Sequence, residues 1–202
     1  MAIRYESYAA DGRLTWQKAV SDMRDEFDYR SVSALITLDG VDVASIRVTV
    51  SSESEELSYP EAINDGDYER LFDRTPGWSR LPERSDYVEC SRTAVLPSHR
   101  GRGLWFLLAA QMVAMARPSG RPFIVGSAID ELLPTWQKVG YRRTGLRYFN
   151  DDIGGRTHEM IVLDIERVIG GECDRRFHPL VLAALDGGSV WSPEVLTILS
   201  RR

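Results

Sequence analysis

Apolar positions change their spacing several times along the chain, and each change predicts a different element. Leu14 to Phe27 carries apolar side chains at helical spacing, which predicts an amphipathic helix. Two β-branched runs follow, Val32 to Leu38 and Val41 to Val50, and the Asp39-Gly40 pair between them predicts a hairpin with a two-residue turn. The first residues, Ile3 to Ala9, fit an edge strand.

The apolar pattern weakens between Ser51 and Ser85, where Ser, Pro, Gly and charged residues predominate. We expect one short helix in this segment, around Tyr68 to Phe72. A connection of this length is seldom passive in a compact domain. Two interpretations therefore stay open: a lid over an acceptor site and a variable excursion.

The strongest pattern in the chain is a strand, a glycine loop and a helix. Tyr87 to Val95 predicts the strand, Pro97 opens a turn, and Leu104 to Ala116 has apolar residues at helical spacing. Glycines let the backbone approach an anion closely, and the N–H groups of a first helical turn bind anions at the positive end of the helix dipole. The loop alternates charge with glycine, Arg100-Gly101-Arg102-Gly103, so it predicts a phosphate cradle.

Short strands and helices alternate in the second half, and this order predicts the α+β class with a single mixed sheet flanked by helices. The chain of 202 residues is expected to form one domain, 1–168, with an irregular insertion at 51–85 and a C-terminal helical tail, 169–202, packed on it. The predicted strands are Phe123 to Gly126, Tyr141 to Asn150 and His158 to Ile165, and the predicted helices are Glu131 to Val139, Leu180 to Leu185 and Pro193 to Ser200.

The glycine loop resembles motif A of the GNAT acyltransferases, Arg/Gln-x-x-Gly-x-Gly/Ala. Arg100 and Gly103 match it, whereas Trp105 stands where a Gly or Ala is usual. The phrase LLPTWQKVGYRRTG resembles the second signature of that family, and the resemblance covers roughly residues 30 to 165. It implies a GNAT-like fold, with acyl-CoA as co-substrate and a splayed strand, Thr93 to Leu96, that pairs with the pantetheine arm. The implied cofactor-binding residues are Ala94, Val95, Leu96, Arg100, Gly101, Arg102, Gly103 and Leu104.

Acyl transfer to an amine also needs a group that takes a proton and a group that gives one. By the resemblance Glu89 is the candidate base, because several members of the family have a catalytic glutamate at this place on the strand before the loop; the alternative is a structural ion pair with Arg92, Arg47 or another arginine. The family's usual tyrosine acid is replaced by Trp136, whose indole cannot protonate a thiolate. Tyr141 is our candidate acid, and the alternatives are Tyr148, Tyr87, water or an unassisted thiolate.

A second resemblance rests on three short phrases, DEFD, SIR and ECSR. They are similar to the layout of acyl-homoserine lactone synthases and N-acyl amino acid synthases. By this resemblance Asp25 and Asp28 hold the acceptor or order an N-terminal lid, and Arg47 and Arg92 bind a carboxylate, which suits a planar guanidinium. The alternative is that the arginines pair with the aspartates.

The amino-acid composition and the net charge argue against several other classes of protein. The formal net charge of −5 argues against a general nucleic-acid binder. No apolar run has the length of a membrane span or the character of a signal peptide, so we expect a cytoplasmic protein with no membrane partner. Cys90 and Cys173 are expected to be free thiols, and the three histidines have no ligand spacing, so no metal is expected.

These observations predict a GNAT-like N-acyltransferase that passes an acetyl or longer group from acyl-CoA to the primary amine of a small molecule, with an amino acid as one candidate. Two alternatives stay open. One is an N-acyl amino acid or acyl-homoserine lactone synthase that depends on acyl-carrier protein, and the other is a non-catalytic acyl-CoA-binding sensor. The apolar tail helices either pack on their own domain or support a homodimer.

Overall fold

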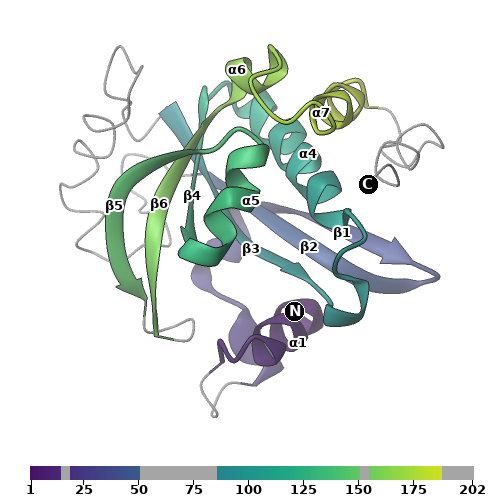
Figure 1. Ribbon diagram of the computed structural model, residues 1–202. Helices are drawn as coiled ribbons and strands as arrows, with labels where there is room; N and C mark the ends of the chain where they lie inside the picture. Colours follow the sequence, from purple (N-terminus) through teal and green to yellow (C-terminus); the bar gives the residue numbers. More distant parts are fainter. Residues whose placement is uncertain (15–18, 51–85, 151–154, 188–202) are drawn as a thin grey trace.

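The computed structural model describes residues 1–14, 19–50, 86–150 and 155–187. Its strands form one sheet, and its helices lie on one face and at one end of that sheet (Figure 1). The elements are α1 (Ala2–Ala10), 3₁₀ turns at Val20–Met23 and Glu26–Arg30, β1 (Ser31–Leu38), β2 (Val41–Val50), β3 (Tyr87–Val95), a 3₁₀ turn at Pro97–His99, α4 (Leu104–Ala116), a 3₁₀ turn at Arg117–Ser119, β4 (Phe123–Ile129), a 3₁₀ turn at Asp130–Leu132, α5 (Leu133–Lys138), β5 (Arg142–Asn150), β6 (Arg156–Asp164), α6 (Ile165–Ile169) and α7 (His178–Leu185).

The sheet has six strands in the order β1-β2-β3-β4-β6-β5. The central pair, β3 and β4, is parallel, and the other four neighbouring pairs are antiparallel. A parallel pair needs a crossover connection, which α4 provides. The expected fold class, α+β with a single mixed sheet flanked by helices, is confirmed.

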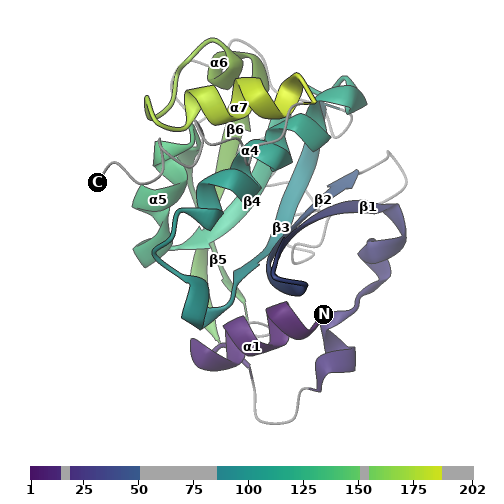
Figure 2. The same ribbon diagram turned by 90° about the vertical axis from the view of Figure 1, so that its right-hand side faces the viewer.

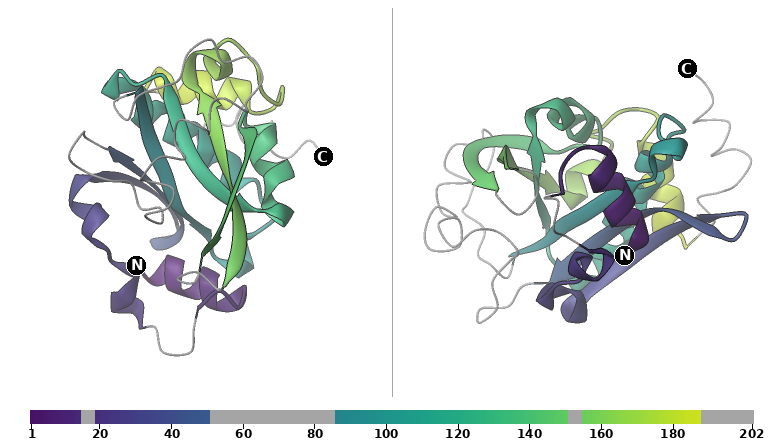
Figure 3. Two further views of the ribbon diagram at one scale, coloured as in Figure 1. Left: turned by 90° about the vertical axis from the view of Figure 1, so that its left-hand side faces the viewer. Right: turned by 90° about the horizontal axis from the view of Figure 1, so that it is seen from below.

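The main core lies between the sheet and α4. Alternate residues of β2, β3, β4 and β6 face this helix, among them Val88, Ile124 and Ile161. Helix α7 lies across α4 on the side away from the sheet (Figure 2), where Phe177 and Leu180 are fully buried. From the opposite side the strands stand in front of α4 and α7 (Figure 3). The tail therefore adds a layer to the same core, whereas the predicted helix Pro193 to Ser200 lies outside the described residues.

The hairpin and the strand-loop-helix unit match the predictions closely. Asp39 and Gly40 have φ values of 50° and 78°, as a two-residue turn between β1 and β2 requires. β3 spans the predicted residues, and α4 begins directly after Gly103. The strand expected at Phe123 to Gly126 continues to Ile129, and the short helix Tyr68 to Phe72 lies outside the described residues.

The N-terminal predictions were wrong. Residues 2–10 form helix α1, not an edge strand, and bury Ile3, Arg4, Ser7 and Tyr8. Two of these four buried residues are polar, so the apolar positions alone do not show the helical spacing of the buried face. The long helix expected from Leu14 is also absent from the described residues around Asp25, which has extended backbone and caps a 3₁₀ turn. The Asp25 carboxylate accepts from Phe27 N at 3.1 Å, and that of Asp28 accepts from Asp25 N at 3.2 Å.

The strand predicted to run to Ile165 ends at Asp164, where the chain turns into α6. The Asp164 carboxylate accepts a hydrogen bond from the backbone N–H of Arg167 at 3.1 Å and so caps the new helix. A single polar residue inside an apolar run is a weak signal of a helix N-cap. The spacing of the apolar residues alone therefore did not show where this strand ends.

Candidate functional site

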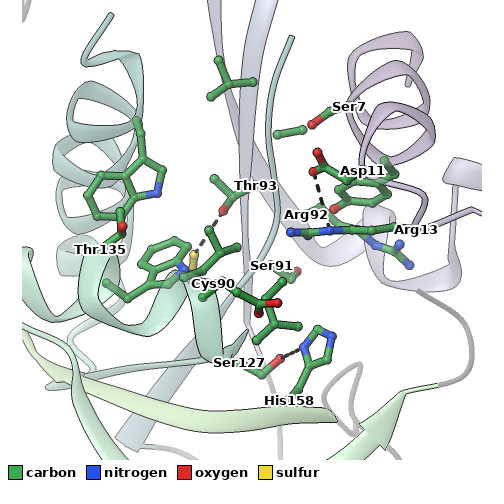
Figure 4. A pocket seen from close by; sticks show the side chains of 18 of the residues that line it. Ser7, Asp11, Arg13, Cys90, Ser91, Arg92, Thr93, Ser127, Thr135 and His158 are labelled. Carbon is green, nitrogen blue, oxygen red and sulfur yellow. Dashed lines mark hydrogen bonds and ion pairs between the residues drawn. The ribbon is translucent and has the colours of Figure 1, made fainter. Parts of the chain in front are cut away.

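A cavity of about 640 Å³ opens between β3 and β4. Figure 4 shows it between the N-terminal helix on one side and α4 and α5 on the other. Its lining combines the N-terminal segment, residues 89–95 of β3, the glycine loop, the start of α4, and inward side chains of β4, β5 and β6. A volume of this order suits a small-molecule ligand.

The cavity exists because β3 and β4 separate. They pair only between residues 87–89 and 123–125. Beyond that point the register of β3 against β2 shifts, and Arg92 has a left-handed φ of 55°. A bulge of this kind bends a strand and re-aims its side chains. After Glu89, the β4-facing backbone of β3 has no strand partner among the described residues, so it is open to a ligand.

The glycine loop forms the mouth of the cavity. Gly101 and Gly103 have φ values of 75° and 76°, a conformation that favours glycine, and Gly103 is the N-cap of α4. Of the predicted cofactor-binding residues, six line the cavity and two, Leu96 and Arg102, do not. The six are Ala94, Val95, Arg100, Gly101, Gly103 and Leu104.

Arg100 is tied into the fold rather than left for a ligand. Its Nη1 donates to Asp11 Oδ1 at 2.6 Å, and its Nη2 donates to Asp11 Oδ2 and to the Ser7 carbonyl and hydroxyl oxygens. Its Nε donates to the Val95 carbonyl at 3.2 Å. The glycine loop is therefore fastened to α1, and exposed Arg102 is the cradle arginine that stays on the surface.

The residues of the second predicted motif form one ion-pair network. Arg47, fully buried, donates to Asp25 Oδ1 at 2.5 Å and to Asp28 Oδ1 at 2.9 Å. Arg92 donates to Asp25 Oδ2 through Nη2 at 2.8 Å and through Nε at 3.2 Å. Burial would raise the pKa of the Asp25 carboxyl, but the hydrogen bonds and charges of Arg47 and Arg92 together hold it below its ordinary value.

This network corresponds to the alternative in which the arginines pair with the aspartates. Asp25, Asp28 and Arg47 do not line the cavity, whereas Arg92 does. The network fixes the N-terminal 3₁₀ turn onto β2 and β3, because its members come from all three segments.

Glu89 lies at the point where the two strands separate. It is fully buried, lines the cavity, and shares its face of the sheet with Arg47. Its charge acts on three neighbours, since it is among the causes that raise the pKa of Arg47, of Cys90 and of Tyr148. The predicted base thus stands inside the cavity and close to a tyrosine.

Three polar side chains that the sequence did not single out as a group meet beside Glu89. Ser127 Oγ lies 2.7 Å from Tyr148 Oη and 3.3 Å from His158 Nδ1. Burial is the main cause that raises the pKa of Tyr148 to about 12 and lowers that of His158 to about 4. Near neutral pH the tyrosine therefore keeps its proton and the histidine is uncharged. A polar residue inside the apolar run FIVGSAI was the only sequence signal for Ser127.

Tyr141, the predicted acid, lies in the core. It does not line the cavity, and its hydroxyl donates to Met112 Sδ at 3.4 Å. Burial raises the pKa of its phenol well above the ordinary value. Trp136 stacks edge-on between Tyr141 and Trp105, with ring centroids 5.2 and 5.1 Å away, and both tryptophans line the cavity. The Trp105 ring thus forms part of the cavity wall beside the glycine loop.

Comparisons with known proteins find likeness in structure only. No family model matches the chain, and no curated protein sequence matches it. FeeM, an N-acyl amino acid synthase from uncultured soil microbes, superposes with a TM-score of 0.58 at 10% identity over 84% of this chain and 90% of its own. Two CoA-dependent acyl-homoserine lactone synthases also superpose. BjaI has a TM-score of 0.59 at 14% identity over 93% of this chain and 81% of its own, and MesI has 0.54 at 16% over 92% and 86%.

This chain has the fold of those synthases. The resemblance seen in the DEFD, SIR and ECSR phrases is thereby confirmed as a likeness of fold.

Two further properties concern the described ranges alone. None of their helices combines the length and apolar character that crossing a bilayer requires. Within the same ranges, no three His, Cys, Asp or Glu side chains gather as metal ligands.

Proposed function

We propose that the protein is an N-acyltransferase that moves an acyl group from acyl-CoA to the primary amine of a small molecule. One observation carries the proposal: a single cavity joins a glycine cradle at its mouth, an open strand edge along its wall and a buried carboxylate, Glu89, at its end. These are the three parts that a held thioester and an attacking amine require.

The donor side supplies binding and orientation. The N–H groups at the start of α4 and the charge of Arg102 take the phosphates, and the open backbone of residues 93 and 94 pairs with the amides of the pantetheine arm. The thioester carbon then lies near Glu89. Trp105 and Trp136 flank this part of the cavity, so they set the room for the acyl group.

The acceptor side supplies proton transfer. Glu89 accepts a proton from the amine as nitrogen attacks the thioester carbon, so that a C–N bond forms and the C–S bond breaks. Tyr148, protonated and inside the cavity, replaces Tyr141 as the group that gives a proton to the departing thiolate. Overall, one proton moves from the nitrogen to the sulfur. Glu89 and Tyr148 return to their starting protonation states when a proton passes from Glu89 to Tyr148.

Calorimetric titration with acetyl-CoA, a long-chain acyl-CoA and free CoA tests the donor assignment. We expect saturable binding to the wild type and its loss in Gly103→Trp, because φ at position 103 is 76°, a conformation that side chains strain, and because an indole there would block the approach of a phosphate to the start of α4. A melting curve of the variant separates lost binding from lost fold.

Release of the CoA thiol in the presence of amines tests the chemistry. Donor binding without thiol release for any amine would favour the sensor alternative. No binding of any CoA, with release from an acyl-carrier protein, would favour the carrier-dependent synthase.

A further inference from the structure

Among the residues that the structure describes, four arginines line the cavity, and three of them have clear partners. Arg92 donates twice to Asp25, and Arg100 donates to both oxygens of the Asp11 carboxylate. Arg156 lies at the rim, 3.6 Å from Glu131 Oε1, and its side chain is 41% exposed. The fourth, Arg13, is different.

The side chain of Arg13 is shielded from solvent but makes no hydrogen bond within the described ranges of the chain. Its Nε is completely buried without a hydrogen-bond partner, and its side chain is 16% exposed. The nearest carboxylate oxygen, Asp11 Oδ2, is 3.6 Å away and already accepts a hydrogen bond from Arg100. Its guanidinium carbon lies 5.9 Å from the centre of the Tyr8 ring, which attracts the cation but accepts no strong hydrogen bond.

The charge of Arg13 reaches the polar cluster of the cavity. Figure 4 shows Arg13, Asp11 and Arg92 on the side formed by the N-terminal segment, with Ser127 and His158 on the sheet nearby. After burial, Arg13 is the largest cause of the lowered pKa of His158, ahead of Arg156. The cavity therefore has a positive wall at Arg13 and a carboxylate, Glu89, at the separation of the strands.

Burying a guanidinium whose N–H donors have no hydrogen-bond acceptor costs free energy unless a ligand supplies the acceptor. Its planar fork fits the two oxygens of a carboxylate. Arg47, the earlier candidate for this contact, is fully buried behind the cavity and bound to Asp25 and Asp28. Arg13 is free to take that role.

We propose that Arg13 binds an anionic group of the acceptor and so selects amino carboxylates over neutral amines. The proposal rests on the proposed N-acyl transfer and names a specificity-determining residue for it. The amine nitrogen of such an acceptor is directed toward Glu89, and its carboxylate toward Arg13.

Matched acceptor pairs test this contact. Glycine, L-leucine and L-phenylalanine are each compared with their own carboxamides, with thiol release from an acyl-CoA as the readout. We expect Arg13→Gln to lower kcat/KM for the carboxylates by about tenfold or more and for the carboxamides by less than about twofold. Because each ratio compares variant with wild type on one amine, differences in amine basicity cancel. Arg13→Lys should lie between, since it keeps the charge but loses the fork.

Arg24→Gln is the matched control, because Arg24 is an exposed arginine of the same N-terminal segment outside the cavity lining. It should leave both acceptor classes unchanged. Equal loss for carboxylates and carboxamides in Arg13→Gln, with an unchanged melting temperature, would overturn the assignment.

A binding readout keeps this test separate from the proposed function. Calorimetry with the same six amines, without donor, should give carboxylate binding to the wild type that falls about tenfold in Arg13→Gln. If no amine releases thiol but this difference persists, acyl transfer fails and the Arg13 assignment stands. Absent carboxylate binding, or equal binding by the wild type and the variant, would refute it.

Discussion

The donor and acceptor sides of the cavity are built in different ways. The donor side is one continuous unit, β3, the glycine loop and α4, whose geometry follows from a bulge and two left-handed glycines. The acceptor side is assembled from the N-terminal segment and from β4, β5 and β6, and ion pairs and hydrogen bonds hold it together. Local backbone geometry shapes the first side, which the Arg100–Asp11 ion pair then joins to α1, whereas the second side depends throughout on partners that are far apart in the chain.

The two sides meet at Glu89, so Glu89→Gln should have the largest effect. The amide keeps the shape of the side chain but cannot take a proton, and we expect turnover to fall by about 10²-fold or more while donor affinity stays within about twofold. Steady-state thiol release and calorimetry measure the two quantities. Glu166→Gln, on exposed α6, is the control. Retained turnover would remove Glu89 from the mechanism.

Asp25→Asn should break the acceptor side without changing the glycine loop. It removes one of the two carboxylates that pair with buried Arg47, together with the carboxylate that pairs with Arg92, and we expect a loss of about 3 kcal/mol in the free energy of unfolding. Urea denaturation measures this loss, with exposed neighbour Glu26→Gln as the control. A change below about 0.5 kcal/mol, the usual range of surface substitutions, would mean that the network does not hold the N-terminal segment.

The same network predicts the response of stability to acid. The pKa of Asp25 is lowered in the folded protein, so its contribution is complete above the unfolded value of about 3.9 and is lost as pH falls through the folded value. Asp28 behaves in the same way, because its pKa is also lowered. The wild type should therefore lose stability below about pH 4 more steeply than Asp25→Asn does.

This contrast also explains what could be predicted from the sequence. The hairpin, β3, the glycine loop and α4 depend on neighbours in the chain, and turn residues, glycines and the spacing of apolar residues predicted these elements correctly. Helix α1 buries Arg4 and Ser7, and the 3₁₀ turn at Asp25 is stabilised by Arg47 and Arg92 from distant strands. The pattern of apolar positions does not show which polar residues from distant parts of the chain will pair.

The same limit applied to the site. Glu89 was predicted because it lies on the strand before the loop, and the structure places it in the cavity. Ser127, Tyr148 and His158 come from three strands, and their meeting depends on the register of β6 between β4 and β5. Spacing along the chain could not show that Tyr148, rather than Tyr141, faces the cavity.

The donor side is probed by reversing the charge at its surface. Arg102→Glu puts a negative charge beside the N-terminus of α4, and we expect donor affinity to fall by about thirtyfold, equivalent to about 2 kcal/mol. Arg117→Glu makes the same change at the other end of the helix and should leave the dissociation constant within about twofold. Amine selectivity should not change in either variant. An equal effect at both positions would indicate a diffuse charge effect rather than a phosphate cradle.

The smallest effect should come from the two tyrosines, and it decides which of them faces the reaction. A CoA thiolate is only modestly basic, with a thiol pKa near that of cysteine, about 8.5, so a phenol of pKa about 12 gives it limited help. We therefore expect Tyr148→Phe to lower turnover by roughly tenfold, less than a typical general acid contributes. Tyr141→Phe removes a hydroxyl whose partners are the sulfur atoms of Met112 and Cys90, and turnover should stay within about twofold. Single-turnover thiol release compares the two variants. The reverse order of effects would restore Tyr141 as the acid and would mean that the cavity reaches deeper, past Trp136, when the donor is bound.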